Sequence, residues 1–262
     1  MTLELLISAL NAKPELLISK MKIASDAILI NQCDVCGYEE ITGSFGKVTV
    51  YSGTDRGIGV SRNLALSKAT ADILLFSDDD IVYNPSYRND IINEFAKHPE
   101  ADGIFFNVDV DKSRKTYEID DFGPVTFRNS GRFPAYSLAV KREKVQGVVS
   151  FSTLFGGGAK YSCGEDSLFI VDCLKADLKL YESPIWIGKE VVRPSTWFNG
   201  YNEKLFFDRG VLYHFLYNRA AFPLACRFIL KHRKEICTTV KPSRALSLMR
   251  EGIKEGRSIK HP

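Results

Sequence analysis

The stretch ADILLFSDDDIVYNP, residues 71–85, sets a short apolar run directly against three consecutive acids. The run Ile73–Phe76 has the length and composition of a buried strand, and Asp78, Asp79 and Asp80 stand at its exit. Carboxylates this close repel one another, so keeping all three ionised requires solvent or a cation nearby. The stretch therefore predicts either a solvated loop or a site for a divalent metal ion.

Outward from this stretch, short apolar runs alternate with helical patterns over roughly the first 180 residues, which is typical of βαβ units in a parallel sheet. We expect strands at Leu3–Ser8, Ala27–Asn31, Lys47–Ser52, Ile73–Phe76 and Gly103–Val108. Helical spacing of apolar residues predicts helices over 60–71 and 86–98, and a further strand is expected within 135–143. The sequence thus predicts an α/β fold with a mostly parallel sheet flanked by helices.

The C-terminal part has a different character. We expect the sheet pattern to stop at Pro184, after which aromatic-rich helical segments continue to the end of the chain. The predicted organisation is an α/β domain over residues 1–200 and a helical, basic extension over 201–262. From Arg219 onward, basic residues far outnumber acids, so this extension is expected either to pack on the first domain or to meet an anionic membrane surface.

Composition places the chain among ordinary globular proteins: 262 residues, 45% hydrophobic and 26% charged. The net charge of +3 is too small to indicate a nucleic-acid partner. The opening MTLELLISAL lacks a cationic start and predicts no signal peptide, so we expect a cytoplasmic protein whose six cysteines are reduced. Cys33 and Cys36 form a lone C-x-x-C without a second pair at zinc-like spacing.

The acids at 78–80 suit hard cations. In open α/β sheets, ligands bind beyond the carboxyl ends of the strands, which is where these acids are expected. Oxygen ligands are those that Mg²⁺ and Mn²⁺ prefer, and such ions commonly share their coordination with substrate phosphates.

A second motif, TDRGIGVSRNLALSKA, precedes the acidic strand. Gly57 and Gly59 come just before a predicted helix whose first backbone N–H groups are free to bind an anion, with Arg56 and Arg62 close in sequence. A tight turn entering a helix, with Arg62 and Asn63 as surface residues, is the alternative interpretation.

A third motif is FGGGAKYSCGEDSLFIVDCLKADLKL. Gly156, Gly157 and Gly158 predict a flexible loop, and Glu165 and Asp166 begin a helix. One interpretation is a general base that receives the proton of an acceptor hydroxyl beneath the glycine loop. The other is a pair of N-terminal acids favoured by the helix dipole.

Together, these three motifs resemble the nucleotide-sugar-dependent glycosyltransferases of family 2, which have the GT-A fold. The matching runs are Gly57–Asn63, Asp78–Asp80 and Gly164–Asp166, in the family's order, and the resemblance covers roughly residues 1–200. It implies an inverting, metal-dependent hexosyltransferase that moves a sugar from a nucleotide diphosphate sugar, with a UDP-sugar favoured, to a hydroxyl of a glycan or lipid-linked glycan. Bacterial surface polysaccharide synthesis is the implied setting.

The resemblance also implies roles for individual residues. Asp80 and Asp78 would hold Mg²⁺ or Mn²⁺, Asp166 would act as the base, and Glu165 would orient the acceptor. The residues implied to bind the donor are Asp34, Arg56, Gly57, Arg62, Asn63, Asp78 and Asp79.

Two regions depart from the family pattern. The turn after the second predicted strand reads NQCDVCGY, which leaves Asp34 as the nearest acid for contact with the nucleotide base. Late in the domain, KEVVRPSTWFNG stands where some relatives carry a histidine. Lys189, Arg193 and Trp197 are candidates for a lid or an acceptor site, together with Gly157 and Gly158; a packed tryptophan beside surface cations is the alternative.

Two other functions are compatible with parts of the sequence. Asp78-x-Asp80 after an apolar strand mimics the nucleophile motif of haloacid-dehalogenase-like phosphatases, although that family normally places it on the first strand. A non-catalytic protein that binds a sugar or nucleotide is the second alternative. The sequence does not indicate the oligomeric state.

Overall fold

The structure is a computed structural model that describes residues 1–112, 114–192 and 200–260. The chain forms two compact units. Unit 1 consists of Met1–Arg56, Val60–Phe151 and Phe169–Arg193, and unit 2 consists of Gly57–Gly59, Ser152–Leu168 and Pro194–Pro262. Both units draw on separate stretches of chain, and the domain boundary at residue 200 stays a prediction.

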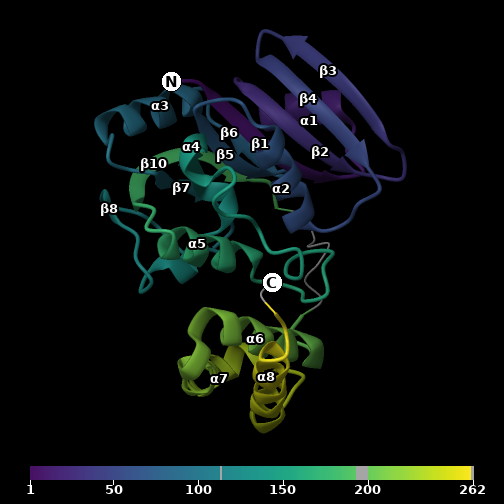
Figure 1. The fold of residues 1–262 in the computed structure, drawn as a ribbon, viewed down its shortest axis with the longest axis vertical. Coiled ribbons are helices and arrows are strands. Elements are labelled where there is room, and N and C mark those ends of the chain that lie inside the picture. The colour runs from purple at the N-terminus through teal and green to yellow at the C-terminus, as the bar shows by residue number, and fades with distance from the viewer. Residues whose placement is uncertain (113, 193–199, 261–262) are drawn as a thin grey trace. The chain divides into compact units, whose positions relative to one another are not determined.

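Unit 1 is built on one mixed sheet with the strand order β3-β4-β2-β1-β5-β9-β7-β10-β6, and β8 pairs with β10 (Figure 1). Its strands are β1 (Leu3–Leu10), β2 (Asp26–Gln32), β3 (Gly37–Gly43), β4 (Gly46–Gly53), β5 (Ile73–Asp78), β6 (Ile81–Tyr83), β7 (Gly103–Asp109), β8 (Gly123–Pro124), β9 (Leu138–Lys141) and β10 (Leu180–Glu190). The pairs β1–β2, β1–β5, β2–β4 and β7–β10 are parallel. The α/β prediction and all the predicted strands are confirmed.

The central strands are apolar on both sides because helices cover both faces of the sheet. One face packs on α1 (Pro14–Met21) and α3 (Tyr87–Lys97), and includes Leu3, Leu5 and Ile7 of β1. The other face includes Leu6 of β1 and packs on the parts of α2 (Ile58–Lys68) and α5 (Glu165–Lys175) that belong to unit 1. This alternation along β1 follows from the two-residue period of a strand.

The prediction that the sheet ends at Pro184 is wrong. Strand β10 continues to Glu190 and pairs with both β7 and β6. Its register shifts between Glu182 and Trp186 and again before Gly188, and Trp186 is exposed. These irregularities break the alternation of apolar and polar residues along β10. The sequence therefore does not predict this part of the strand, which is held by pairing with its neighbours.

The remaining helices of unit 1 are short. They are α4 (Arg142–Val145) and the 3₁₀ turns η1 (Ser130–Arg132) and η2 (Ala135–Ser137).

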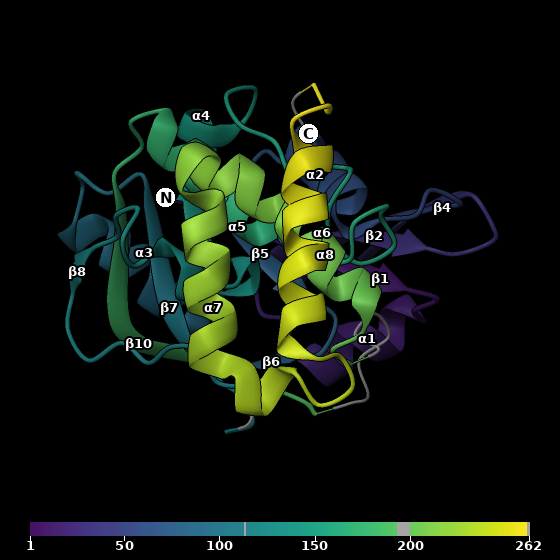
Figure 2. The same ribbon diagram turned by 90° about the horizontal axis from the view of Figure 1, so that it is seen from below.

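Unit 2 contains α6 (Glu203–Tyr217), η3 (Asn218–Ala220), α7 (Ala221–Ile236) and α8 (Pro242–Gly256), which confirms the helical C-terminal region (Figure 2). Phe206, Ala225, Ile229 and Met249 are among the residues that form its shared core. Helices α6 and α8 approach closely where Gly210 faces the Met249 backbone, since a Cβ at Gly210 would overlap the Met249 carbonyl.

Two properties bear on the predicted setting of the protein. Among the described residues, none of the helices combines the length and apolar character that a bilayer span requires. All six cysteines, each within the described ranges, are free thiols.

Candidate active site

The acidic run lies at the carboxyl end of β5, in unit 1. Asp78 is the last residue of that strand, and Asp79 and Asp80 form the turn to β6. Asp79 and Asp80 are each only 8% exposed, so the turn is built into the protein rather than extended into solvent. The backbone N–H of Val191 donates to the Asp80 carbonyl over 2.8 Å, which ties the turn to the chain just after β10.

Asp78 is held by a buried arginine. The Arg62 guanidinium on α2 donates to the Asp78 carboxylate over 3.0 Å; the Arg62 side chain is 3% exposed and that of Asp78 30%. The guanidinium also lies 5.2 Å from the centre of the Phe151 ring. Because a buried arginine is costly without a counter-charge, this pair fixes the orientation of the Asp78 carboxylate and offsets its charge.

Two further hydrogen bonds hold the end of β5 and involve the other face of the strand. The hydroxyl of fully buried Tyr83 donates to Ser77 Oγ over 2.7 Å, and Ser77 Oγ donates to the Asp78 carbonyl over 3.1 Å. Burial raises the pKa of Tyr83 well above its ordinary value, so the phenol stays neutral and keeps donating. The acidic turn is therefore held by side chains on both of its strands.

Ser8 is a candidate site residue that the sequence analysis did not identify. It lies on β1 directly opposite Asp78 in the parallel pairing, and it is 4% exposed. Within the described ranges its hydroxyl has no hydrogen-bond partner. Paired residues on neighbouring strands share a face, so Ser8 presents a buried polar atom beside Asp78 that a ligand could satisfy. No sequence pattern marks Ser8, because its position depends on the register between β1 and β5.

Asn63 has a structural role that the sequence did not reveal. Its side-chain amide donates to the Phe151 carbonyl over 2.8 Å, and its side-chain carbonyl accepts from the Phe151 N–H over 2.7 Å. The amide thus pairs with both backbone groups of one residue, which positions the ring that lies under Arg62. Contact of Asn63 with a donor stays a prediction.

Asp34 and Arg56 lie together after the ends of β2 and β4. Arg56 donates to the Asp34 carboxylate over 2.7 Å and to the Thr54 carbonyl over 2.7 Å. The Asp34 side chain is 92% exposed and that of Arg56 37%, so the pair contributes little to stability and remains accessible to a ligand. A cavity of about 50 Å³ beside these strand ends is lined by residues of β2, β4 and α2, among them Gln32, Gly53 and Ser61.

Of the lid or acceptor candidates, Lys189, Gly157 and Gly158 lie within the described residues. Lys189 lies on β10 opposite Val82 of β6, two residues beyond Asp80, and is exposed. Arg193 and Trp197 lie outside the described residues.

Unit 2 brings the glycine loop and the start of α5 together. The N–H of Ile58 donates to the Gly157 carbonyl over 3.0 Å, which joins the loop to the Gly57–Gly59 turn. Gly156 has a φ of +103°, and a Cβ there would lie 2.7 Å from the Glu165 carboxylate. The glycine at 156 is thus required both by its backbone conformation and by the approach of Glu165.

The same loop is anchored to the helices of unit 2. Asp208 on α6 is 2% exposed and accepts from the Ser162 N–H over 2.9 Å and from Ser162 Oγ over 2.8 Å. Gly164, with φ +113°, leaves no room for a Cβ against the Leu212 side chain. Glu165 and Asp166, both half-buried in the first turn of α5, therefore follow a turn that α6 holds in place. Sequence reasoning missed Asp208 because it is remote along the chain.

The acids at β5 fit a hard cation by their chemistry. Within the described ranges, no three or more His, Cys, Asp or Glu side chains are arranged to hold an ion. Two carboxylates suffice where a substrate diphosphate and waters supply the other oxygens. Asp78 and Asp80 offer such oxygens at the exit of one strand, so the donor set fits Mg²⁺ or Mn²⁺, and binding of the metal stays a prediction.

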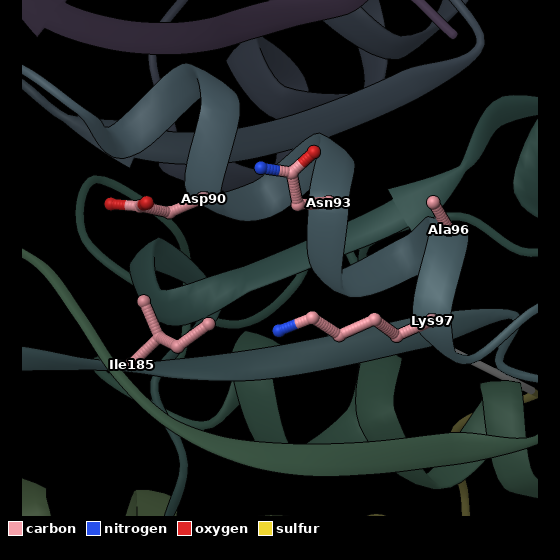
Figure 3. Close-up of a pocket in the computed structure, with 5 residues that line it drawn as sticks. All are labelled: Asp90, Asn93, Ala96, Lys97 and Ile185. Carbon is pink, nitrogen blue, oxygen red and sulfur yellow. The ribbon is translucent and has the colours of Figure 1, made fainter.

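A second hollow lies away from these groups in unit 1. It measures about 370 Å³ and is lined by Asp90, Asn93, Ala96 and Lys97 of α3 and by Ile185 of β10 (Figure 3). None of these five residues belongs to the three motifs.

The fold and the acidic strand end define a class: an α/β enzyme of the GT-A type, in which a sheet flanked by helices presents acids beyond the end of a central strand. A family model described as Glycosyl transferase family 2 matches residues 24–155, just over half of the chain. The chain belongs to this family and is a nucleotide-sugar glycosyltransferase. Family membership also removes the basis for the phosphatase alternative.

Solved structures show the same fold. Residues 1–349 of S. aureus TarS in complex with UDP-GlcNAc superpose with a TM-score of 0.64 at 14% identity, covering 91% of this chain and 74% of that chain. The complex of the same TarS fragment with UDP gives a TM-score of 0.62 at 14% identity, with the same coverage of 91% and 74%. Against the longer TarS structure, this chain spans 50% of the length, at 15% identity and a TM-score of 0.64. Among curated protein sequences, none matches the chain.

Proposed function

We propose that this protein is an inverting hexosyltransferase that moves a sugar from a UDP-sugar to a hydroxyl of a glycan or lipid-linked glycan. The observation that carries the proposal is the ion pair between buried Arg62 and partly exposed Asp78 at the exit of β5, which fixes a carboxylate where the family motif has its acids. The TarS structures contain UDP and UDP-GlcNAc, which supports the choice of nucleotide. Synthesis of a bacterial surface polysaccharide is the setting we propose.

The donor is held through its diphosphate and its nucleoside. Asp80 and Asp78 would hold Mg²⁺ or Mn²⁺, and the ion would offset the charge that develops on the departing diphosphate. Asp79 and Arg62 border that site, and Ser8 offers its buried hydroxyl beside Asp78. Asp34 and Arg56 receive the nucleoside end, since their exposed pair can open to bind base or ribose groups.

The acceptor is activated by a carboxylate at the start of α5. The acceptor oxygen attacks the anomeric carbon, its proton passes to the Asp166 carboxylate, and the bond between that carbon and the diphosphate oxygen breaks. Attack from the face opposite the leaving group inverts the stereochemistry. Glu165, packed against Gly156, orients the acceptor hydroxyl, and Lys189 is the residue of unit 1 that we propose to contact the acceptor.

A binding experiment tests the donor site. UDP is titrated into the purified protein with MnCl₂ or with EDTA, and Asp80→Asn is compared with Asp90→Asn on α3. We expect Mn²⁺ to strengthen UDP binding, and Asp80→Asn to weaken the metal-supported binding about 10- to 100-fold. Equal binding by the wild type and Asp80→Asn would remove Asp80 from the site, while the Asp90 variant controls for loss of any surface acid.

A turnover experiment tests the base and identifies the donor. Nucleotide sugars are screened for release of UDP, and Asp166→Asn is compared with Asp172→Asn, which changes another acid of α5. Loss of general-base catalysis is expected to lower kcat about 10²- to 10⁴-fold in Asp166→Asn while UDP binding is retained. Binding of nucleotide sugar without turnover of any donor by the wild type would favour a non-catalytic binding protein.

The location of the protein is part of this proposal. A cytoplasmic enzyme at the inner face of the cell membrane has access both to nucleotide sugars and to lipid-linked acceptors. The basic composition after Arg219 supports this placement, because anionic lipids attract basic segments.

A further inference from the structure

Helix α7 has one face turned away from the core of unit 2. At the helical spacing of 100° per residue, its buried residues Ala221, Ala225 and Ile229 share one side and pack in a core that also contains residues of α6 and α8. The exposed residues on the opposite arc form what we call the outer face of α7: Pro223, Arg227, Leu230, Lys231 and Lys234.

The outer face exposes apolar groups. Leu230 is 67% exposed, and Pro223, also exposed, lies about 20° from it on the same arc. Phe222, which is 39% exposed, lies outside this face beside the buried side of the helix, and the Arg250 guanidinium of α8 lies 5.8 Å from the centre of its ring. Scattered apolar residues are common on surfaces, but Leu230 and Pro223 lie on one helical arc among cations.

The same face is positively charged. Within the part of the chain that the structure describes, none of its three cations, Arg227, Lys231 and Lys234, forms an ion pair. Glu235, the single acid in the α7 sequence, lies at the edge of this arc, 3.4 Å from His232 Nδ1. Figure 2 shows α7 and α8 as neighbouring helices of unit 2, connected at one end. The outer face thus combines apolar groups with uncompensated positive charge along a helix of 16 residues.

We propose that the outer face of α7 docks this enzyme onto an anionic lipid bilayer. Cations on such a helix attract acidic headgroups, while an exposed leucine side chain enters the boundary with the acyl chains. A nucleic acid would use the charge but not the exposed Leu230, so lipid is the better match. The inference rests on the proposed function, because docking would bring the enzyme to the lipid-linked acceptor named there.

Vesicle sedimentation with the full chain tests the proposal. Vesicles contain phosphatidylcholine alone or with about one third phosphatidylglycerol, at low and high salt. We expect binding only to the anionic vesicles, with loss at high salt because exposed charges are screened. The triple variant Arg227→Gln, Lys231→Gln, Lys234→Gln is expected to bind at least about ten-fold more weakly.

Matched variants test whether a loss of vesicle binding is specific to the outer face of α7. Lys13→Gln, Lys20→Gln, Lys22→Gln removes three exposed cations of unit 1 and is expected to bind as the wild type does. Leu230→Gln is expected to weaken binding, whereas Leu16→Gln, at a leucine 65% exposed on α1, is not.

Several outcomes overturn the proposal: no preference for anionic vesicles, equal losses in the two triple variants, no effect of Leu230→Gln, or tighter binding to duplex DNA than to vesicles at equal salt. UDP binding is measured on the same samples. Retained UDP binding with no vesicle binding would overturn only the docking surface, whereas vesicle binding without UDP binding would overturn the donor site.

Discussion

At the scale of single residues, the site depends on side chains whose partners are distant in sequence. Arg62 and Asn63 are neighbours in one motif, yet Arg62 pairs with Asp78 while Asn63 pairs with the Phe151 backbone. The motif therefore contacts both the Asp78 carboxylate at the end of β5 and the Phe151 backbone, which positions the Phe151 ring. This explains why the two residues stand together: successive positions on α2 reach two different partners.

Loss of Arg62 is expected to be far more costly than loss of an exposed arginine. Arg62→Met removes the counter-charge of Asp78 and should lower the free energy of unfolding by about 2 kcal/mol, less than for a fully buried pair because Asp78 is 30% exposed. Arg56→Met, whose partner Asp34 is exposed, should cost about 0–1 kcal/mol. Urea unfolding of both variants provides the comparison. Similar losses would show that the Arg62–Asp78 pair is not a stabilising feature.

At the scale of secondary-structure elements, α6 holds the turn that precedes the predicted base. Asp208 receives two hydrogen bonds from Ser162 and also contacts Lys204 on its own helix. Gly164 packs directly against Leu212. The residues that position Glu165 and Asp166 in unit 2 therefore include side chains of the C-terminal helices, as well as the glycine loop.

Asp208→Asn is expected to affect turnover more than donor binding. All three donors, the Ser162 N–H, Ser162 Oγ and Lys204, reach one carboxylate oxygen of Asp208, and a neutral amide oxygen accepts such hydrogen bonds more weakly, so the turn before Asp166 should loosen. We expect kcat to fall about ten-fold or more, as misplacement of a catalytic group predicts, with little change in UDP affinity. Glu203→Gln changes another acid of α6, one that forms an exposed pair with Arg244 of α8, and is the control. Parallel losses of kcat and UDP binding would indicate general unfolding instead.

At the scale of the whole molecule, two compact units divide the three motifs between them. Asp78–Asp80 and Arg62 belong to unit 1, whereas Gly57, the glycine loop, Glu165 and Asp166 belong to unit 2. The charged residues proposed for donor binding and those proposed for the base are thus each held within their own unit.

The stability of the protein is expected to fall below about pH 6.5 because of His214 in α6. Burial, followed by the charge of Arg257, lowers the pKa of His214 from its ordinary value of 6.5. A lowered folded-state pKa means that the unfolded chain binds the proton more readily. The stabilisation is fully present above pH 6.5 and is lost as the pH falls through the folded-state value.

Thermal unfolding between pH 7.5 and pH 5 measures this effect. His214→Gln should show a smaller loss of stability over that interval than the wild type, whereas His232→Gln, on α7, should behave as the wild type does. The same pH dependence in wild type and His214→Gln would assign the loss to other groups.

The sequence by itself determined the elements with a clear physical period. Strand β5 and its acids were predictable because an apolar run ending in charge has one stable placement, with the run buried and the acids at the rim. The helices carrying the second and third motifs were predictable for the same kind of reason, since their apolar residues recur at helical spacing.

Only the tertiary structure decided the rest. The continuation of β10 past Pro184 depends on pairing with β7 and β6, and its register shifts hide it from any periodicity. Ser8 lies beside Asp78 only through the register of β1 and β5, and Asp208 meets Ser162 only because α6 packs in unit 2. Periodicity is a local property of the chain, whereas these contacts join residues far apart in sequence, and so they appear only in the folded protein.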